Sequence, residues 1–155
     1  MITRRIAVRG IIFKDGKLLC QQLKRGKDGQ KRDYWCTPGG GLDPIEGLID
    51  GLRREMIEET GVMPDIGSLL FIQQLVDGDE EHLEFFFHIK NAHDYTAVDL
   101  AKTTHGELEI ENMNFVDPAK ENVLPAFLQT IDIDDAIKNQ KPVEIINYIH
   151  SSTAE

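Results

Sequence analysis

Short runs of apolar residues alternate with polar turns along much of the chain, a pattern typical of β-strands. Residues 4–23, RRIAVRGIIFKDGKLLCQQL, contain two such runs, and Asp15-Gly16 between them is a preferred two-residue turn. We therefore predict a hairpin here. Residues 24–34 are polar, charged and glycine-bearing, which predicts a loop. Further strands are predicted over SLLFIQQLV, HLEFFFHIK and LEIENMNFV, with the turn DGDEE between the first two and FFF buried on both faces.

A helix is predicted from about residue 44 to residue 60, because Gly61 suits a left-handed C-cap. One side of this helix is apolar and should face the core; it contains Ile45, Leu48, Ile49, Leu52 and Met56.

Two more helices are expected toward the C-terminus. Asp117-Pro118 supplies an N-cap and a first-turn proline for a helix over AKENVLPAFLQ, which Pro125 should shorten or bend. The tail, residues 133–150, is predicted to be helical, with an interruption near Pro142. Strands on both sides of a central helix, with helices at the end, predict an α/β fold: an α/β/α sandwich with a central mixed β-sheet.

Composition limits the class of protein. A chain of 155 residues with 41% hydrophobic content suits a single domain over residues 1–155. It has no apolar run of about 18 residues and no signal-peptide pattern, so we expect a soluble, cytoplasmic protein. A net charge of −10 argues against binding to a nucleic acid polymer or an anionic membrane. Cys20 and Cys36 lack zinc-ligand spacing and are expected to be free thiols.

Basic residues gather in two places, and their ordinary interpretation is a solvated face. Phosphate contact is the alternative, and Arg9 and Arg32 are the candidates for it. The two groups are Arg4, Arg5 and Arg9, then Lys24, Arg25, Lys27, Lys31 and Arg32.

Three glutamates at the end of the predicted helix oppose its local stability. Glu55, Glu58 and Glu59 stand at i, i+3 and i+4, where like charges cost about 0.2–0.5 kcal/mol per pair and anions oppose the helix dipole. They either form a solvated acidic face offset by Arg53 and Arg54, or bind a hard cation such as Mg²⁺ or Mn²⁺.

Glycines favour the second interpretation. Gly51 precedes Glu55 by one turn and, without a side chain, should leave room for a metal, water or ligand. The triplet Gly39-Gly40-Gly41 just before the helix gives a backbone that a ligand can approach closely.

The spacing of these residues resembles the Nudix box. Gly40, five residues, Glu46, seven residues and then REMIEETGV match the complete box over residues 40–62. The flanking stretches WCTPGG and ELEIENMNFV are similar to the segments that surround the box in that family, so the resemblance extends over residues 1 to about 130.

The resemblance implies a Nudix hydrolase that uses Mg²⁺ or Mn²⁺. Glu55, Glu58 and Glu59 would hold the metal with a backbone carbonyl of Gly40 or Gly41, and Arg54 would pair with a neighbouring carboxylate. Glu46 would cap the helix or accept that arginine.

The general base is left between Glu55 and Glu109. Substrate contacts are expected from Arg9, Arg32, Gly39 and Gly40, with Tyr34 or Trp35 stacking on a nucleobase. Other glutamates considered as base are Glu107, Glu111, Glu80, Glu81 and Glu84.

Three functions are considered. The first is hydrolysis of a nucleoside diphosphate linked to another moiety: a nucleoside triphosphate, ADP-ribose or a nucleotide sugar. The second is a silent domain that senses a nucleotide or nucleotide sugar, which the intact glutamates disfavour. The third, isomerisation of a prenyl diphosphate, usually departs from the full box. A homodimer is expected by analogy with the family.

Overall fold

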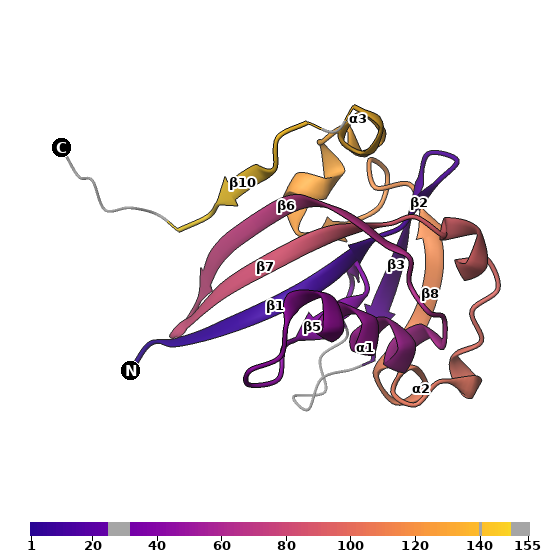
Figure 1. Ribbon diagram of the computed structural model, residues 1–155, viewed down its shortest axis with the longest axis horizontal. Coiled ribbons are helices and arrows are strands. Elements are labelled where there is room, and N and C mark those ends of the chain that lie inside the picture. Colours follow the sequence, from indigo (N-terminus) through magenta and orange to yellow (C-terminus); the bar gives the residue numbers. More distant parts are fainter. Residues whose placement is uncertain (25–31, 140, 150–155) are drawn as a thin grey trace.

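Two β-sheets with helices packed around them make up the fold in a computed structural model, which describes residues 1–24, 32–139 and 141–149 (Figure 1). In chain order the elements are β1 Thr3–Ile11, β2 Phe13–Lys14, β3 Lys17–Leu23, β4 Trp35–Cys36, β5 Gly39–Gly41, α1 Leu48–Thr60, β6 Ile66–Asp77, β7 Glu80–Ile89, the 3-10 helices η1 Ala92–Tyr95 and η2 Leu100–Lys102, α2 Gly106–Glu109, β8 Ile110–Val116, β9 Val123–Leu124, the 3-10 helix η3 Ala126–Gln129, α3 Ile133–Lys138 and β10 Glu144–Asn147.

Both sheets contain parallel and antiparallel pairs. The first has the order β10-β6-β7-β1-β5, and β1 runs parallel to β7 but antiparallel to β5. The second has the order β2-β3-β4-β9, with β8 antiparallel to β3 and β9 parallel to β4. The predicted α/β fold with a central mixed β-sheet is therefore confirmed.

The N-terminal hairpin is shorter than predicted. Asp15 and Gly16 form the expected turn, and both have the positive φ that a tight hairpin turn needs, 52° and 77°. The turn joins only β2 to β3, however. The preceding strand β1 belongs to the other sheet, where it pairs with β7 from Thr3 opposite Glu80 onward. The chain changes sheets at Ile12, which periodicity alone does not reveal.

Helix α1 begins at Leu48 rather than near residue 44. Ile45 lies before it with φ of 65° and is fully exposed, so its predicted place in the core is wrong. Ile49, at 40% exposure, also faces solvent more than predicted. Leu52 and Met56, by contrast, are completely buried, as expected of the apolar side of the helix.

The predicted helix over residues 119–129 is replaced by a turn, the short strand β9 and the 3-10 helix η3. Pro125 lacks the amide hydrogen that a continuous helix would use, and it instead forms the N-cap of η3.

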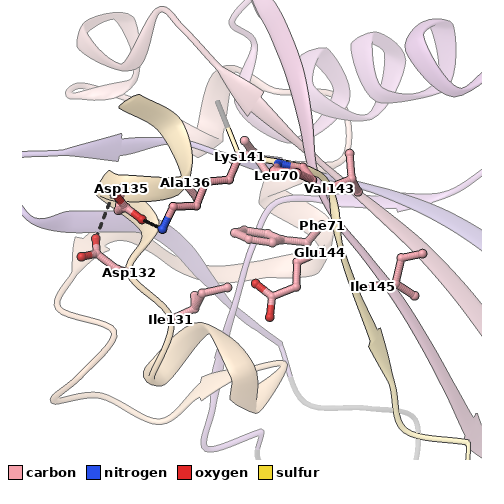
Figure 2. A pocket seen from close by; sticks show the side chains of 11 residues that line it. Leu70, Phe71, Ile131, Asp132, Asp135, Ala136, Lys141, Val143, Glu144 and Ile145 are labelled. Atoms are coloured by element: carbon pink, nitrogen blue, oxygen red, sulfur yellow. Dashed lines mark hydrogen bonds and ion pairs between the residues drawn. The ribbon is translucent and has the colours of Figure 1, made fainter. Parts of the chain in front are cut away.

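The tail is helical only in α3, and β10 is a strand that runs parallel to β6. The predicted interruption near Pro142 is present, but residues 144–147 are not helical, because they pair with β6 as a strand instead. Together with β6 they border a cavity of about 530 Å³, where Lys141 pairs with Asp135 (Figure 2).

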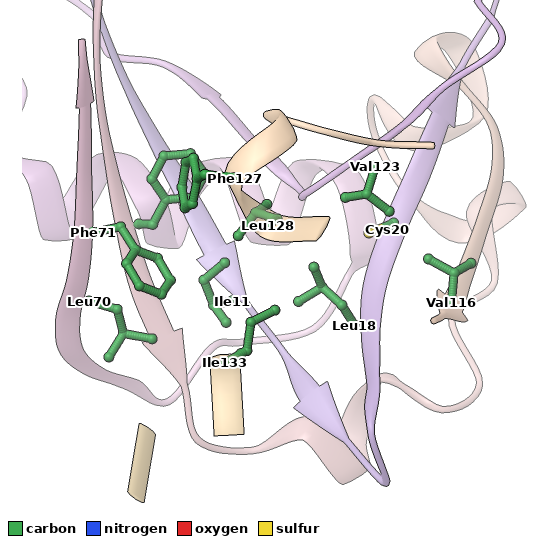
Figure 3. Packing of buried hydrophobic residues seen from close by; sticks show 11 residues of the cluster. Ile11, Leu18, Cys20, Leu70, Phe71, Val116, Val123, Phe127, Leu128 and Ile133 are labelled. Carbon is green, nitrogen blue, oxygen red and sulfur yellow. The ribbon is translucent and has the colours of Figure 1, made fainter. Parts of the chain in front are cut away.

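The core has two parts. Between the two sheets, the ring of Phe127 packs edge-on against Phe71 (Figure 3) and Phe86. Its centroid lies 5.4 Å from that of Phe71 and 5.5 Å from that of Phe86. The second part lies beneath α1, where Met56 joins Phe87 and other apolar residues. Phe86 packs in the first part and Phe87 in the second, on the opposite face of β7. This confirms that FFF is buried on both faces.

Two further findings concern the cysteines and the lengths of the helices. Cys20 and Cys36 are free thiols, the first buried and the second half-buried. Within the three described ranges, no helix is long and apolar enough to cross a bilayer.

Candidate active site

The last two turns of α1 place the three predicted carboxylates at the edge of the first sheet. Glu59 is only 4% exposed, and its carboxylate accepts a hydrogen bond of 2.9 Å from the backbone N–H of Gly39. Burial raises the pKa of Glu59 to about 8, although the Gly39 N–H and the positive charge of Arg9 oppose the rise. A carboxylate this deeply buried binds protons or cations readily.

Two glycines allow the backbone to approach these carboxylates. Gly39 has φ of 135°, and a Cβ there would lie 2.0 Å from the carbonyl oxygen of Val8 on the paired strand β1. A Cβ on Gly40 would lie 2.7 Å from the carboxylate of Glu55. Only glycine lets β5 pass between β1 and the acidic end of α1 in this way.

Arg54 lies between the glutamates and joins them in one network. Its Nε and Nη2 donate to both carboxylate oxygens of Glu46 at 2.8 Å, and Nη1 donates to Glu55 and Glu58 at 3.1 Å each. A further bond of 3.2 Å reaches the carbonyl of Gly41. Such a two-pronged pair fixes the arginine, which in turn fixes the rotamers of the carboxylates.

The same network sets the proton affinities of its members. The hydrogen bonds from Arg54, with one from the Asp43 amide, lower the pKa of Glu46 to about 2, and the pKa of Arg54 is raised mainly by its bonds to Glu46. The pKa of Glu55 is raised by burial, against the opposing charge of Arg54. Glu46 is therefore a permanent anion, whereas Glu55 holds a proton more readily than an exposed glutamate.

Gly51 has a different role from the one predicted. A Cβ at this position would lie 2.2 Å from Leu42 Cδ2 and 2.9 Å from Glu46 Oε1. The missing side chain therefore admits Leu42 and Glu46 against the helix, and the space at Gly51 is filled by these two side chains.

Arg9, from the predicted basic cluster, connects this acidic end to a neighbouring pocket. Its guanidinium donates to the carbonyls of Thr37 and Gly39 at 3.3 Å and lies 3.8 Å from Glu84. Burial lowers the pKa of Arg9, but the carboxylate of Glu84, with smaller contributions from nearby anions, more than offsets that effect and raises it. Arg9 is thus a fixed, mostly buried cation.

The pocket has a volume of about 500 Å³ and lies between the two sheets. Three of the predicted substrate-binding residues, Arg9, Arg32 and Tyr34, line it, and Arg32 donates to the Tyr34 hydroxyl at 3.2 Å. Sequence reasoning considered Glu84 only as a general base and missed its partner Gln73, because alternation along β6 and β7 indicates only which side chains share a face. The predicted alternative to Tyr34, Trp35, packs instead against the core.

Glu109 is exposed at the end of α2. The segment before it packs on the end of α1: the His105 imidazole lies 3.0 Å from the Glu58 carboxylate, and the backbone N–H of His105 donates to the Glu58 carbonyl at 2.9 Å. A Cβ on Gly106 would lie 2.4 Å from the carbonyl of Glu59. His105 was not predicted to belong to the site, because no spacing in the sequence connects it to residue 58.

The side chains at the end of α1 have donor atoms that suit a divalent metal ion. In the described ranges, no three His, Cys, Asp or Glu side chains already converge as a ligand set, and Glu55 and Glu58 are held by Arg54. The donors are nevertheless all oxygens, as Mg²⁺ and Mn²⁺ require. Glu59 adds a buried carboxylate whose raised pKa reflects a poorly compensated negative charge. The residues present therefore fit a hard divalent cation.

Comparison with known proteins places these features in a family. The NUDIX domain model matches residues 3–143. An ADP-ribose pyrophosphatase of Methanocaldococcus jannaschii is 36% identical over 74 residues, which are 48% of this chain and 42% of that protein. An uncharacterized Nudix hydrolase of Bacillus subtilis, YvcI, is 31% identical over 104 residues, which are 64% and 60% of the two chains. The matches thus span about half the length of these relatives.

The fold comparison agrees with the sequence comparison. The solution structure of the E. coli ORF135 protein superposes with a TM-score of 0.67 at 20% identity, over 91% of this chain and 95% of that one. The family match covers most of the chain and includes the glutamates of α1, the glycines of β5 and Arg54. The chain belongs to the Nudix hydrolase family.

Proposed function

We propose that this chain is a metal-dependent pyrophosphohydrolase that cleaves the diphosphate bond of a nucleoside diphosphate linked to another moiety. One observation carries the proposal. The mostly buried Arg9 lines the cationic pocket and also donates to the carbonyl of Gly39, which lies beside the acidic end of α1. The pocket suits an anionic ligand of nucleotide size, and the carboxylates suit the cation that such a ligand brings with it. The name of the M. jannaschii relative agrees with this class of reaction.

Glu55, Glu58 and Glu59, with the carbonyl of Gly40, would hold Mg²⁺ or Mn²⁺. The bound ion would neutralise the diphosphate oxygens and stabilise charge on the leaving phosphate. Arg54 keeps the carboxylates in position, a positioning role supported by its contacts with Glu46, Glu55 and Glu58.

Arg9, Arg32 and the amides of Gly39 and Gly40 would orient the phosphates, and Tyr34 would stack on the nucleobase. A carboxylate then takes a proton from water, the water oxygen bonds to phosphorus, and the P–O bond to the bridging oxygen breaks. The products are two phosphate esters or, from a nucleoside triphosphate, a nucleoside monophosphate and inorganic pyrophosphate. We propose Glu55 as this base, because its raised pKa and its contact with Gly40 favour it over the exposed Glu109.

The test is a panel of nucleoside triphosphates, ADP-ribose and UDP-sugars, with Mg²⁺ or Mn²⁺, in which mononucleotide products are separated by chromatography. We expect metal-dependent turnover that falls by at least about 100-fold in Glu59→Gln. Glu121→Gln, which changes an exposed carboxylate in the turn before β9, is the matched control and should retain activity.

Glu55→Gln and Glu109→Gln test the two candidate bases at saturating metal, because Glu55 is also a proposed metal ligand. The base is the residue whose replacement removes the fall of kcat at low pH as well as lowering kcat. Absence of turnover for every compound, with folded protein that still binds nucleotides, would overturn the proposal and favour a sensor. The oligomeric state is a separate proposal: we infer a homodimer from the family resemblance, and light scattering of the purified chain tests it.

A further inference from the structure

Two buried polar side chains face each other on the floor of the pocket between the sheets. Gln73 on β6 is directly opposite Glu84 on β7, and its Nε2 donates to Glu84 Oε2 at 3.2 Å. Gln73 is 1% exposed and Glu84 8% exposed, yet both line the pocket. A polar pair at this depth is uncommon unless each of its atoms has a partner.

The pair leaves one acceptor unused. A carboxylate can only accept, so the amide nitrogen of Gln73 must face Glu84 and its carbonyl oxygen must point away. Within the described residues, Gln73 Oε1 has no hydrogen-bond partner. The hydroxyl of Thr37, which is also buried and lines the same pocket, has none either.

The pocket therefore offers two kinds of group to a ligand. Arg5, Arg9 and Arg32 supply positive charge, which suits phosphate. Beside Arg9, which lies 3.8 Å from Glu84, the pair of Glu84 and Gln73 supplies acceptors, because the free atom of Gln73 is a carbonyl oxygen. A ligand that uses both kinds of group carries anionic groups and an N–H donor.

We propose that Gln73 and Glu84 select nucleotides whose base carries an amino group, which donates to Gln73 Oε1. The proposal rests on the proposed function for the diphosphate end of the ligand, and it adds the feature of the base that the pocket recognises. A base without the amino group leaves a buried acceptor unpaired, and sites built in this way reject such analogues strongly.

Pairs of diphosphate compounds that differ only in one amino group provide the test. Adenosine is compared with purine riboside, and guanosine with inosine, each as the diphosphate derivative that the wild type hydrolyses. We expect kcat/KM to favour the amino-bearing member about 10- to 100-fold in at least one pair. Equal values in both pairs would overturn the proposal.

Variants then assign the preference to the residues. Gln73→Leu removes the acceptor and should reduce the ratio to within about 2-fold. Glu84→Gln supplies an amide that can donate to Gln73 Oε1, and it should reduce the ratio as well. Gln74→Leu, whose side chain lies on the other face of β6, is the matched control and should keep the ratio. Thermal unfolding confirms that each variant is folded, and an unchanged ratio in both Gln73→Leu and Glu84→Gln would refute the assignment.

Binding without catalysis separates this proposal from the proposed function. Calorimetry with the corresponding nucleoside monophosphates should show the same preference for the amino group. Amino-dependent binding with no turnover would refute the hydrolase but support this recognition. Turnover with no amino dependence, in rate or in binding, would refute the recognition but leave the hydrolase intact.

Discussion

Replacing the buried carboxylate Glu59 by glutamine should change how stability depends on pH. Folded Glu59 keeps its proton up to about pH 8, whereas the unfolded chain releases it near the ordinary value of 4.5. Between these values the folded state binds more protons than the unfolded state. Without metal, the wild type should therefore lose stability as pH rises through this window, and the loss should level off above about pH 8.

The magnitude follows from the size of the shift. A rise in pKa from 4.5 to about 8 lowers the free energy of unfolding by about 5 kcal/mol once the pH is above the folded-state pKa. Water that enters the metal-free site reduces this penalty, so we expect a difference of about 2–3 kcal/mol, or about 5–10 °C in Tm. Glutamine carries no charge at any pH, and its carbonyl can still accept from the Gly39 N–H.

Thermal unfolding in EDTA between pH 5 and 9 measures the effect. The Tm of Glu59→Gln should exceed that of the wild type by a margin that grows with pH, although this variant is expected to be inactive. Glu111→Gln, an exposed site, should follow the wild-type curve. Parallel curves for Glu59→Gln and the wild type would refute the assignment of a strongly raised pKa to Glu59.

Three further substitutions test other parts of the structure. Gly40→Ala should displace the Glu55 carboxylate, because that carboxylate would lie 2.7 Å from the new Cβ. We expect activity to fall about 10-fold or more with little change in Tm. Full activity would contradict the close approach of this carboxylate to the backbone. Arg54→Lys loses the two-pronged hydrogen bond to Glu46. It should lower the free energy of unfolding in urea by about 1–2 kcal/mol and kcat by at least about 10-fold. Wild-type kinetics would show that the network does not position the site. Phe127→Ala should lower the free energy of unfolding by about 3–5 kcal/mol in urea, and a loss below about 1 kcal/mol would mean that the rings between the sheets are not tightly packed.

The acidic cluster could be predicted because its parts are close in sequence. The positions of Glu55 and Glu59 on one side of a helix follow from helical periodicity, and the glycines just before that helix are local signals as well. The pairing of Gly39 with Glu59 was not predicted in detail, but the two are only 20 residues apart, so few arrangements bring them together.

The pocket could not be predicted, because its residues come together through pairing of strands that are far apart in the sequence. The periodicity of one sequence does not show which strands pair. Glu84 meets Arg9 only because β1 runs parallel to β7, and Gln73 joins them through the register of β6 with β7. The wrong helix over residues 119–129 has a similar origin. Its N-terminal signals are local and genuine, but pairing of β9 with β4 overrides them.

The parallel pairing of β1 with β7 also constrains the order in which the chain can fold. Thr3 is paired with Glu80, 77 residues later, whereas β6 and β7 are joined by a tight turn and can pair as soon as both exist. During synthesis, β1 can pair with β5 once residue 41 has emerged, but its pairing with β7 must wait for that later strand. The contact of Arg9 with Glu84 is therefore made late, whereas the pairing of Gly39 with β1 does not depend on β7.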